Sequence, residues 1–164
     1  MEAYWLEIFN TVRDEFADIP DLETVTRIII RLSLAASLGG ILGYEREQEG
    51  KSAGLRTHML VALGAALFVL IPQQAGVSDA DLTRVLQGLV AGIGFLGAGT
   101  IIKGNGEEDV KGLTTAAGIW LTAAVGTAAG MGREATAVLS TALAFLILAS
   151  VPRLTRRFQR RKSE

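Results

Sequence analysis

The chain has 164 residues, a length that suits one domain of a few membrane helices rather than a membrane unit with a sizeable soluble domain. Hydrophobic residues make up 49% of it and the mean hydropathy is +0.36, more than a soluble domain usually needs. The chain has no cysteine, which excludes disulfides and thiolate metal sites, and its formal net charge of −1 gives no indication of a nucleic-acid partner.

The acidic N-terminus predicts an amphipathic helix over residues 1–20. Residues 1–23 hold seven acidic residues and one basic residue, so we expect no cleavable signal peptide, which would begin with basic residues. Two placements fit the pattern: the helix lies on the membrane surface, or it covers the ends of other helices. Its apolar residues recur at helical spacing at Trp5, Ile8, Phe9, Val12, Phe16 and Ile19.

An all-α membrane domain with five spans is expected over residues 21–152, and its first span covers residues 24–44. Either Asp21 or Thr24 can cap this helix, which is apolar except for Arg27 and Arg31. The two arginines lie one turn apart near its start. They either extend to the membrane interface or face a polar interior, where ionisable residues are functional by default.

Two further spans are expected at 58–77, where Pro72 ends or kinks the helix, and at 85–102. Residues 73–84 would form a polar connection between them. The third span is an uncharged run of eighteen residues, and its glycines include the GxGxxG pattern of dinucleotide-binding turns. No strand precedes the pattern and no acidic residue follows at the required distance, so we expect no nucleotide ligand.

The fourth and fifth spans are expected at 112–132 and 135–151, where Pro152 should end the fifth. A basic tail at 153–164 follows. The fourth span has a small residue at every fourth position from Thr114 to Gly130, so we expect it to be the central helix. Close contacts between helices are expected at Gly39, Gly43, Gly88, Gly92, Gly94, Gly97, Gly118 and Gly126.

The distribution of lysine and arginine predicts the orientation, because basic loops remain in the cytoplasm. If the N-terminus is outside and the C-terminus inside, eleven Lys and Arg side chains lie in the cytoplasm and five lie outside. We therefore expect the loop at 45–58 and the basic tail to be cytoplasmic.

That orientation collects polar residues at the cytoplasmic mouths of four spans. The interpretation as solvated loops and caps is favoured for Glu107 and Glu108, whereas the single histidine could titrate near neutral pH. We expect no catalytic arrangement and no cofactor. A hard-cation site of carboxylates is open at Glu45, Glu47 or Asp109, although their spacing is not specific to a metal. The expected functional cluster comprises Glu45, Arg46, Arg56, Thr57, His58, Asp109, Lys111, Thr114 and Thr115.

Arg56 is expected to be the most consequential member of this cluster. Its planar guanidinium could form a bidentate pair with Glu45 or Asp109 and tie two cytoplasmic loops together. Lysine would keep the charge but lose that geometry.

Four strings of the sequence form a distinctive ordered set: GYERE at 43–47, AGLRTHMLV at 53–61, GIGFLGAGTI at 92–101 and VKGLTTAAGIWLTAAVG at 110–126. Together they resemble the MgtC/SapB family of bacterial inner-membrane proteins over residues 24–132. The resemblance implies a small multi-span protein of the bacterial inner membrane that is linked to survival in low magnesium, acid or intracellular stress. Many relatives carry a soluble C-terminal domain, and we expect a short form without it.

Two functions are compatible with the sequence and this resemblance. In the first, the protein transports or senses an ion such as magnesium, using the intramembrane arginines and the cytoplasmic cluster. In the second, its small-residue faces bind a second copy or another membrane protein, such as the rotary ATP synthase that some relatives restrain. No span carries an acidic residue at its middle, which weakens a cation pathway, although unwound glycine backbone in the third span would supply carbonyl ligands. The lipid bilayer surrounds the chain in both.

Overall fold

The computed structural model describes residues 2–15, 17, 21–103 and 110–162, which divide into two compact units, Met1–Ile30 and Arg31–Glu164. In the first unit, helix α1 (Glu2–Glu15) has the expected amphipathic sequence, and apolar side chains such as Trp5 and Phe9 are exposed. Phe16 and Ile19, which were expected to continue its apolar stripe, lie outside the described residues.

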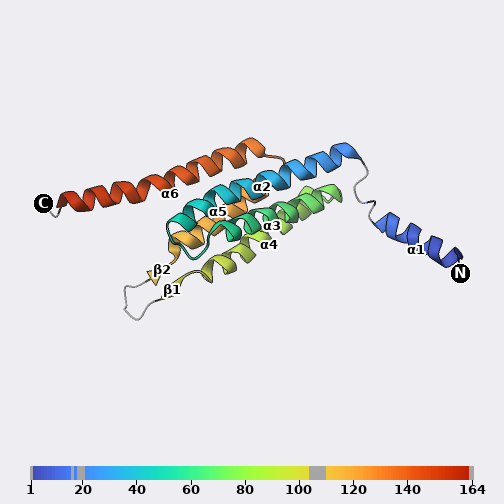
Figure 1. Ribbon diagram of the computed structural model, residues 1–164, viewed down its shortest axis with the longest axis horizontal. Helices are drawn as coiled ribbons and strands as arrows, with labels where there is room; N and C mark the ends of the chain where they lie inside the picture. The colour runs from blue at the N-terminus through green and yellow to red at the C-terminus, as the bar shows by residue number, and fades with distance from the viewer. Residues whose placement is uncertain (1, 16, 18–20, 104–109, 163–164) are drawn as a thin grey trace. The chain divides into compact units, whose positions relative to one another are not determined.

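Five helices carry the membrane domain, in agreement with the expected all-α architecture (Figure 1). A short antiparallel hairpin joins α4 to α5, with Ile102 opposite Lys111 and Lys103 opposite Val110. The elements are α2 (Leu22–Gln48), α3 (Leu55–Gln74), α4 (Asp79–Ala98), β1 (Ile102–Lys103), β2 (Val110–Lys111), α5 (Leu113–Gly130) and α6 (Glu134–Lys162).

Small side chains fill the centre of this bundle, and large apolar side chains cover its outside. This distribution suits a lipid surrounding, because lipid solvates large apolar side chains while small residues let helices approach one another. Exposed side chains include Phe68 at 61% and Leu143 at 62%. The buried core cluster consists of Ala35, Leu38, Ala62, Ala66, Val125, Ala129 and Ala137.

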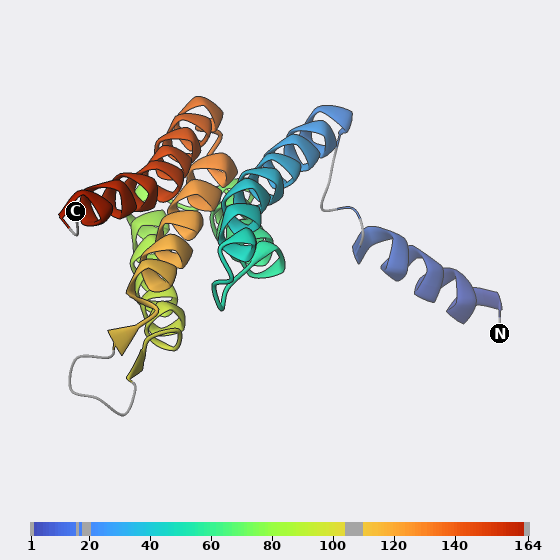
Figure 2. The same ribbon diagram turned by 60° about the vertical axis from the view of Figure 1, so that its left-hand side comes forward.

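Helix α3 is held between α2 and α5 by contacts that only glycine permits, and the three helices run side by side (Figures 1 and 2). A Cβ atom added to Gly39 would lie 2.5 Å from the carbonyl oxygen of His58, and one added to Gly130 would lie 2.5 Å from that of Ala66. Gly126 similarly meets the backbone of Ala62. Helix α5 also packs against α4 and α6, as expected of the central helix.

Helix α4 begins earlier than the sequence pattern predicts. The hydroxyl of Ser78 caps it by accepting a hydrogen bond from the N–H of Asp81 at 3.2 Å, so part of the expected polar connection at 73–84 is helical. The helix continues through Gly92 and Gly94 without interruption. The structure therefore has neither a dinucleotide-binding turn nor an unwound segment there.

Four of the helices are long and apolar enough to cross a membrane: α2, α3, α5 and α6 to Val151. Helix α4 has the length of a span, but Asp79, Asp81 and Arg84 lie in its first two turns. A count of five spans therefore remains a prediction.

The apolar stretch of the expected fifth span does end at Val151, but the helix that carries it does not end at Pro152. Helix α6 continues through this proline to Lys162, and Pro72 likewise lies inside the last turn of α3. Proline removes one backbone hydrogen bond, but residues after Pro152 such as arginine, leucine and glutamine favour helix and prolong it.

Candidate functional site

Polar side chains are buried at the end of the bundle where α2 and α4 finish, α3 and α5 begin, and the β1–β2 hairpin lies. We call this the hairpin end. Arg46, in the last turn of α2, is 3% exposed and forms an ion pair with Glu45, whose side chain is 11% exposed. Burial of a charged group is unfavourable unless an opposite charge lies beside it. Arg46 and Glu45 therefore neutralise each other at this end of α2.

His58 lies deeper in the bundle, where α2, α3 and α5 meet. Its Nδ1 is 3.0 Å from the carbonyl oxygen of Gly54, an acceptor, so Nδ1 carries the proton and donates it. Nε2 is then an unprotonated acceptor; it is fully buried and has no hydrogen-bond partner in the described part of the chain. The ring faces Gly118 of α5, where an added Cβ would lie 3.6 Å from Nε2, an ordinary contact distance.

The other expected cluster members lie at the same end but at different depths. Thr115 is buried and Thr57 is half-buried, whereas Arg56, Thr114 and Lys111 are exposed. Asp109 lies outside the described residues.

Arg56 does not form the expected pair with Glu45, because Glu45 binds Arg46 instead. The loop contact on this side comes from Glu47, which sequence reasoning missed. Its Oε2 accepts a hydrogen bond from the N–H of Leu55 at 2.8 Å and so caps α3. The sequence did contain an indication of this contact, because an acidic side chain is favourable near the N-terminus of a helix and Glu47 shortly precedes the start of α3.

A cleft of about 360 Å³ opens at the hairpin end between the end of α2 and the start of α5. Gly112 lines it at the start of α5 and has φ of 95°, a left-handed conformation that favours glycine. Among the described residues, no three His, Asp or Glu side chains come together in a way that could hold a metal ion. The cleft walls include Arg46, Glu49, Lys51, Thr114 and Thr115.

The two arginines of α2 have different roles. Arg27 is exposed and pairs with Glu23 at 2.5 Å, one turn away. Arg31 is largely buried, with its side chain 18% exposed, and donates a hydrogen bond to the carbonyl oxygen of Gly130 at 3.0 Å. Because the C-terminus of a helix carries partial negative charge, Arg31 stabilises the end of α5. Glu134, at the start of α6, lies 3.8 Å from its Nε.

The glycines of α4 do not all pack within the chain. Gly97 packs against Ala116 of α5: a Cβ added to Gly97 would lie 3.4 Å from the carbonyl oxygen of Ala116. Added Cβ atoms at Gly88, Gly92 and Gly94 would meet nothing within 4 Å. The expected close contacts at these three positions are therefore not made with any described residue of the chain.

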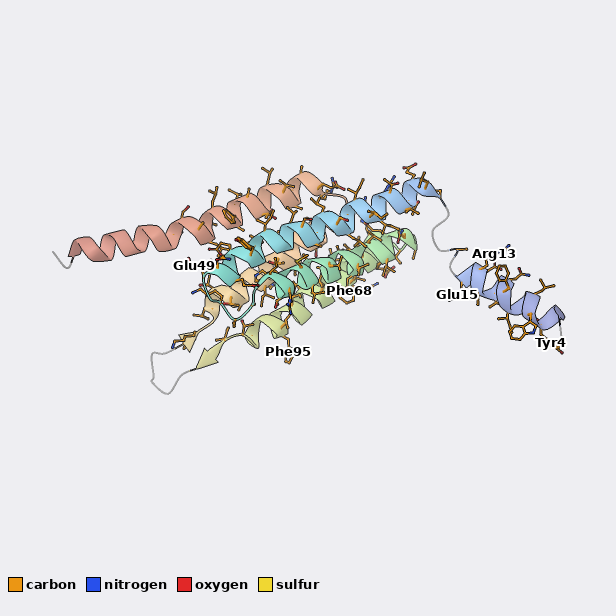
Figure 3. All side chains as sticks on the ribbon, viewed as in Figure 1. Tyr4, Arg13, Glu15, Glu49, Phe68 and Phe95 are labelled. Carbon is orange, nitrogen blue, oxygen red and sulfur yellow. The ribbon has the colours of Figure 1, made fainter. Side chains whose placement is uncertain are left out.

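An apolar groove of about 360 Å³ runs along α4 next to α3, and its walls include Phe68, Gly88, Leu89 and Gly92. Phe95, 85% exposed, projects away from the same helix (Figure 3). The outside of α4 thus combines large apolar side chains with gaps left by glycine.

The fold and these sites define an all-α, multi-pass membrane protein with small-residue packing and a buried polar end. The chain belongs to the MgtC family, whose sequence profile matches residues 32–157. This confirms the resemblance that the four sequence strings indicated. No solved structure matches the chain.

Several relatives share much of the sequence. SrpB of Synechococcus elongatus is 43% identical over 137 residues, which cover 77% of this chain and 75% of SrpB. The Escherichia coli K12 protein named "Putative magnesium transporter YhiD" is 41% identical over 135 residues, covering 77% of this chain and 61% of YhiD. MgtC of Brucella abortus is 46% identical over 110 residues, which cover 67% of this chain and 45% of that protein.

Proposed function

We propose that this chain is a regulator in the bacterial inner membrane that acts in adaptation to low magnesium or related stress. It works by binding another membrane protein, without transporting an ion or catalysing a reaction. The magnesium link rests on the names of two relatives, "Putative magnesium transporter YhiD" and MgtC. The binding mode rests on the packing inside the bundle.

The observation that carries this proposal is the closed interior between α2, α3 and α5. Gly39 and Gly126 bring the neighbouring backbones against α3 from two sides, and Thr122 between them is 0% exposed. A divalent cation needs several oxygen ligands or retained waters along its path. Backbones in direct contact leave no space for such a path.

The outer face of α4 supports the binding role. Glycine at Gly88 and Gly92 disfavours the helix by about 1 kcal/mol each relative to alanine, and contacts within the chain do not offset this. A transmembrane helix of another protein that lies along the groove would gain close backbone contact there. Phe68 at the groove wall would add apolar contact area to that helix.

Magnesium transport is the second candidate, favoured by the name of YhiD and by the polar cleft at the hairpin end. In that case the cleft would be the entrance of a path that opens when the helices separate. The two candidates differ in one measurable quantity, which is ion flux through the protein alone.

Purified protein in sealed phospholipid vesicles with a trapped magnesium indicator tests the proposal. We expect magnesium entry equal to that of empty vesicles, with a known magnesium channel as the positive control. Entry that rises in proportion to the amount of reconstituted protein would establish transport and overturn the proposal.

The proposed orientation places the N-terminus outside and the C-terminus inside. Support comes from the eleven Lys and Arg side chains that this orientation keeps in the cytoplasm. Reporter fusions after Gly50 and after Lys162 should both give a cytoplasmic signal. A periplasmic signal from either fusion would contradict the orientation.

A further inference from the structure

The cleft at the hairpin end has the chemistry of an anion site. It is bounded by the last turn of α2, by the turn between α2 and α3, and by the first turn of α5. Its volume of about 360 Å³ is ample for a tetrahedral oxyanion. Two cationic side chains, Arg46 and Lys51, stand in its wall, and one carboxylate, that of Glu49, stands among them.

The first turn of α5 presents unsatisfied N–H groups to this cleft. Gly112, the N-cap residue, has no side chain to accept from them. The first backbone bond of the helix runs from Ala116 to the carbonyl oxygen of Gly112, and within the described ranges the N–H groups of Leu113, Thr114 and Thr115 have no acceptor. Helix N-termini bind anions because free N–H groups and the helix dipole point at the ligand.

Thr115 provides a second and independent indication. Its side chain lines the cleft although the residue is only 3% exposed, and its hydroxyl has no hydrogen-bond partner among the described residues. The oxygen of this hydroxyl is not fully buried, so it reaches the open space of the cleft, where a ligand can bind it. A ligand oxygen in the cleft would satisfy this hydroxyl.

Arg46 retains donors for a ligand even though it pairs with Glu45. A guanidinium has five N–H donors, and the contacts to Glu45 use only Nε and Nη2. Its burial holds it in place, so it loses little freedom when it binds. Lys51 is exposed at the rim and adds positive charge. The carboxylate of Glu49 repels an anionic ligand, but Glu49 is also exposed, and salt screens repulsion between exposed charges.

We propose that this cleft binds a phosphate group, held by the N–H groups at the start of α5, by the hydroxyls of Thr114 and Thr115, and by Arg46 and Lys51. The cleft lies where helices α2, α3 and α5 end or begin, which is the level of lipid headgroups for spanning helices. The phosphate therefore belongs either to an anionic phospholipid or to a soluble phosphate compound. This inference is independent of the proposed regulatory function and of the flux result.

Two titrations of the full chain in maltoside micelles distinguish the sources. Inorganic phosphate is titrated by calorimetry, and phosphatidylglycerol retention is measured by native mass spectrometry. Lys51→Gln removes one rim charge and should weaken binding about fivefold. Thr115→Val removes one hydrogen bond to a charged ligand and should weaken it about tenfold.

Two matched variants at the opposite end of α5 serve as controls. Arg133→Gln removes an exposed charge and Thr127→Val removes a hydroxyl from the same helix, and both should bind as the unmodified protein does. Equal melting temperatures would show that the variants are folded. Selective weakening in the inorganic arm alone assigns the site to a soluble phosphate, and in the lipid arm alone to a headgroup. Absence of binding in both arms, or equal affinity in all four variants, would overturn the proposal.

Discussion

Gly126→Ala should destabilise the protein although it adds only one methyl group. The new Cβ would overlap the backbone of Ala62, which is part of α3 and cannot turn aside as a flexible side chain could. Overpacking of this kind destabilises by about 1–3 kcal/mol, and the gain in helix propensity from glycine to alanine, about 1 kcal/mol, offsets only part of it. Thermal unfolding in detergent, followed by the loss of the monodisperse chromatographic peak, measures the difference.

Two other glycines provide matched controls for this variant. A Cβ at Gly64 of α3 would meet nothing within 4 Å, so Gly64→Ala should be neutral or stabilising. Gly118→Ala should also be tolerated, because its Cβ would lie 3.6 Å from Nε2 of His58, an ordinary contact. If Gly126→Ala melts at the same temperature as Gly64→Ala, then α5 and α3 do not pack at this distance and the reasoning is refuted.

Three further predictions concern binding, charge and pH. Gly92→Leu should leave the melting temperature unchanged yet abolish stress survival, whereas Val90→Leu on the same helix should change neither quantity. Full survival with Gly92→Leu would mean that this face meets only lipid. Arg56→Lys should impair survival at unchanged membrane abundance while Arg133→Lys does not, because exposed Arg56 offers a planar fork to a partner; equal activity would show that charge alone suffices. Asp21 accepts a hydrogen bond from a backbone N–H in the first turn of α2, which lowers the pKa of its carboxyl group below the ordinary value of 3.8. Its capping contribution to stability is therefore present above pH 3.8 and is lost as the pH falls through the lowered pKa. An NMR titration midpoint at or above 3.8 would contradict the cap.

The helix contacts could largely be predicted from residue spacing. Small residues at intervals of four on α2 and α5 indicated close approach, and Gly39, Gly126 and Gly130 do meet α3. Spacing alone could not identify the partner of each face, however. It gave the same expectation for Gly88 and Gly92, where an added Cβ would meet nothing within 4 Å among the described residues.

The positions of charged side chains were less predictable. Arg27 and Arg31 look equivalent in the sequence, yet only Arg31 reaches the end of α5, because that depends on where a distant helix terminates. Arg46 and Glu45 likewise pair with each other, so Glu45, one of the two partners expected for Arg56, is already engaged. Glu47 and Ser78 are residue types that commonly cap helices, so both caps could have been predicted from the sequence. The helix starts were instead placed by the hydrophobic pattern alone.

The closed interior is the central claim of this account, and thiol accessibility tests it most directly. The chain has no cysteine, so Thr122→Cys introduces a single thiol between α3 and α5, where Thr122 is 0% exposed. A membrane-impermeant thiol reagent applied to open membranes, with and without magnesium, should label Thr114→Cys at the exposed hairpin end and leave Thr122→Cys unlabelled until the protein is denatured. Labelling of Thr122→Cys as fast as Thr114→Cys in either condition would reveal a water-filled path through the bundle and contradict the account.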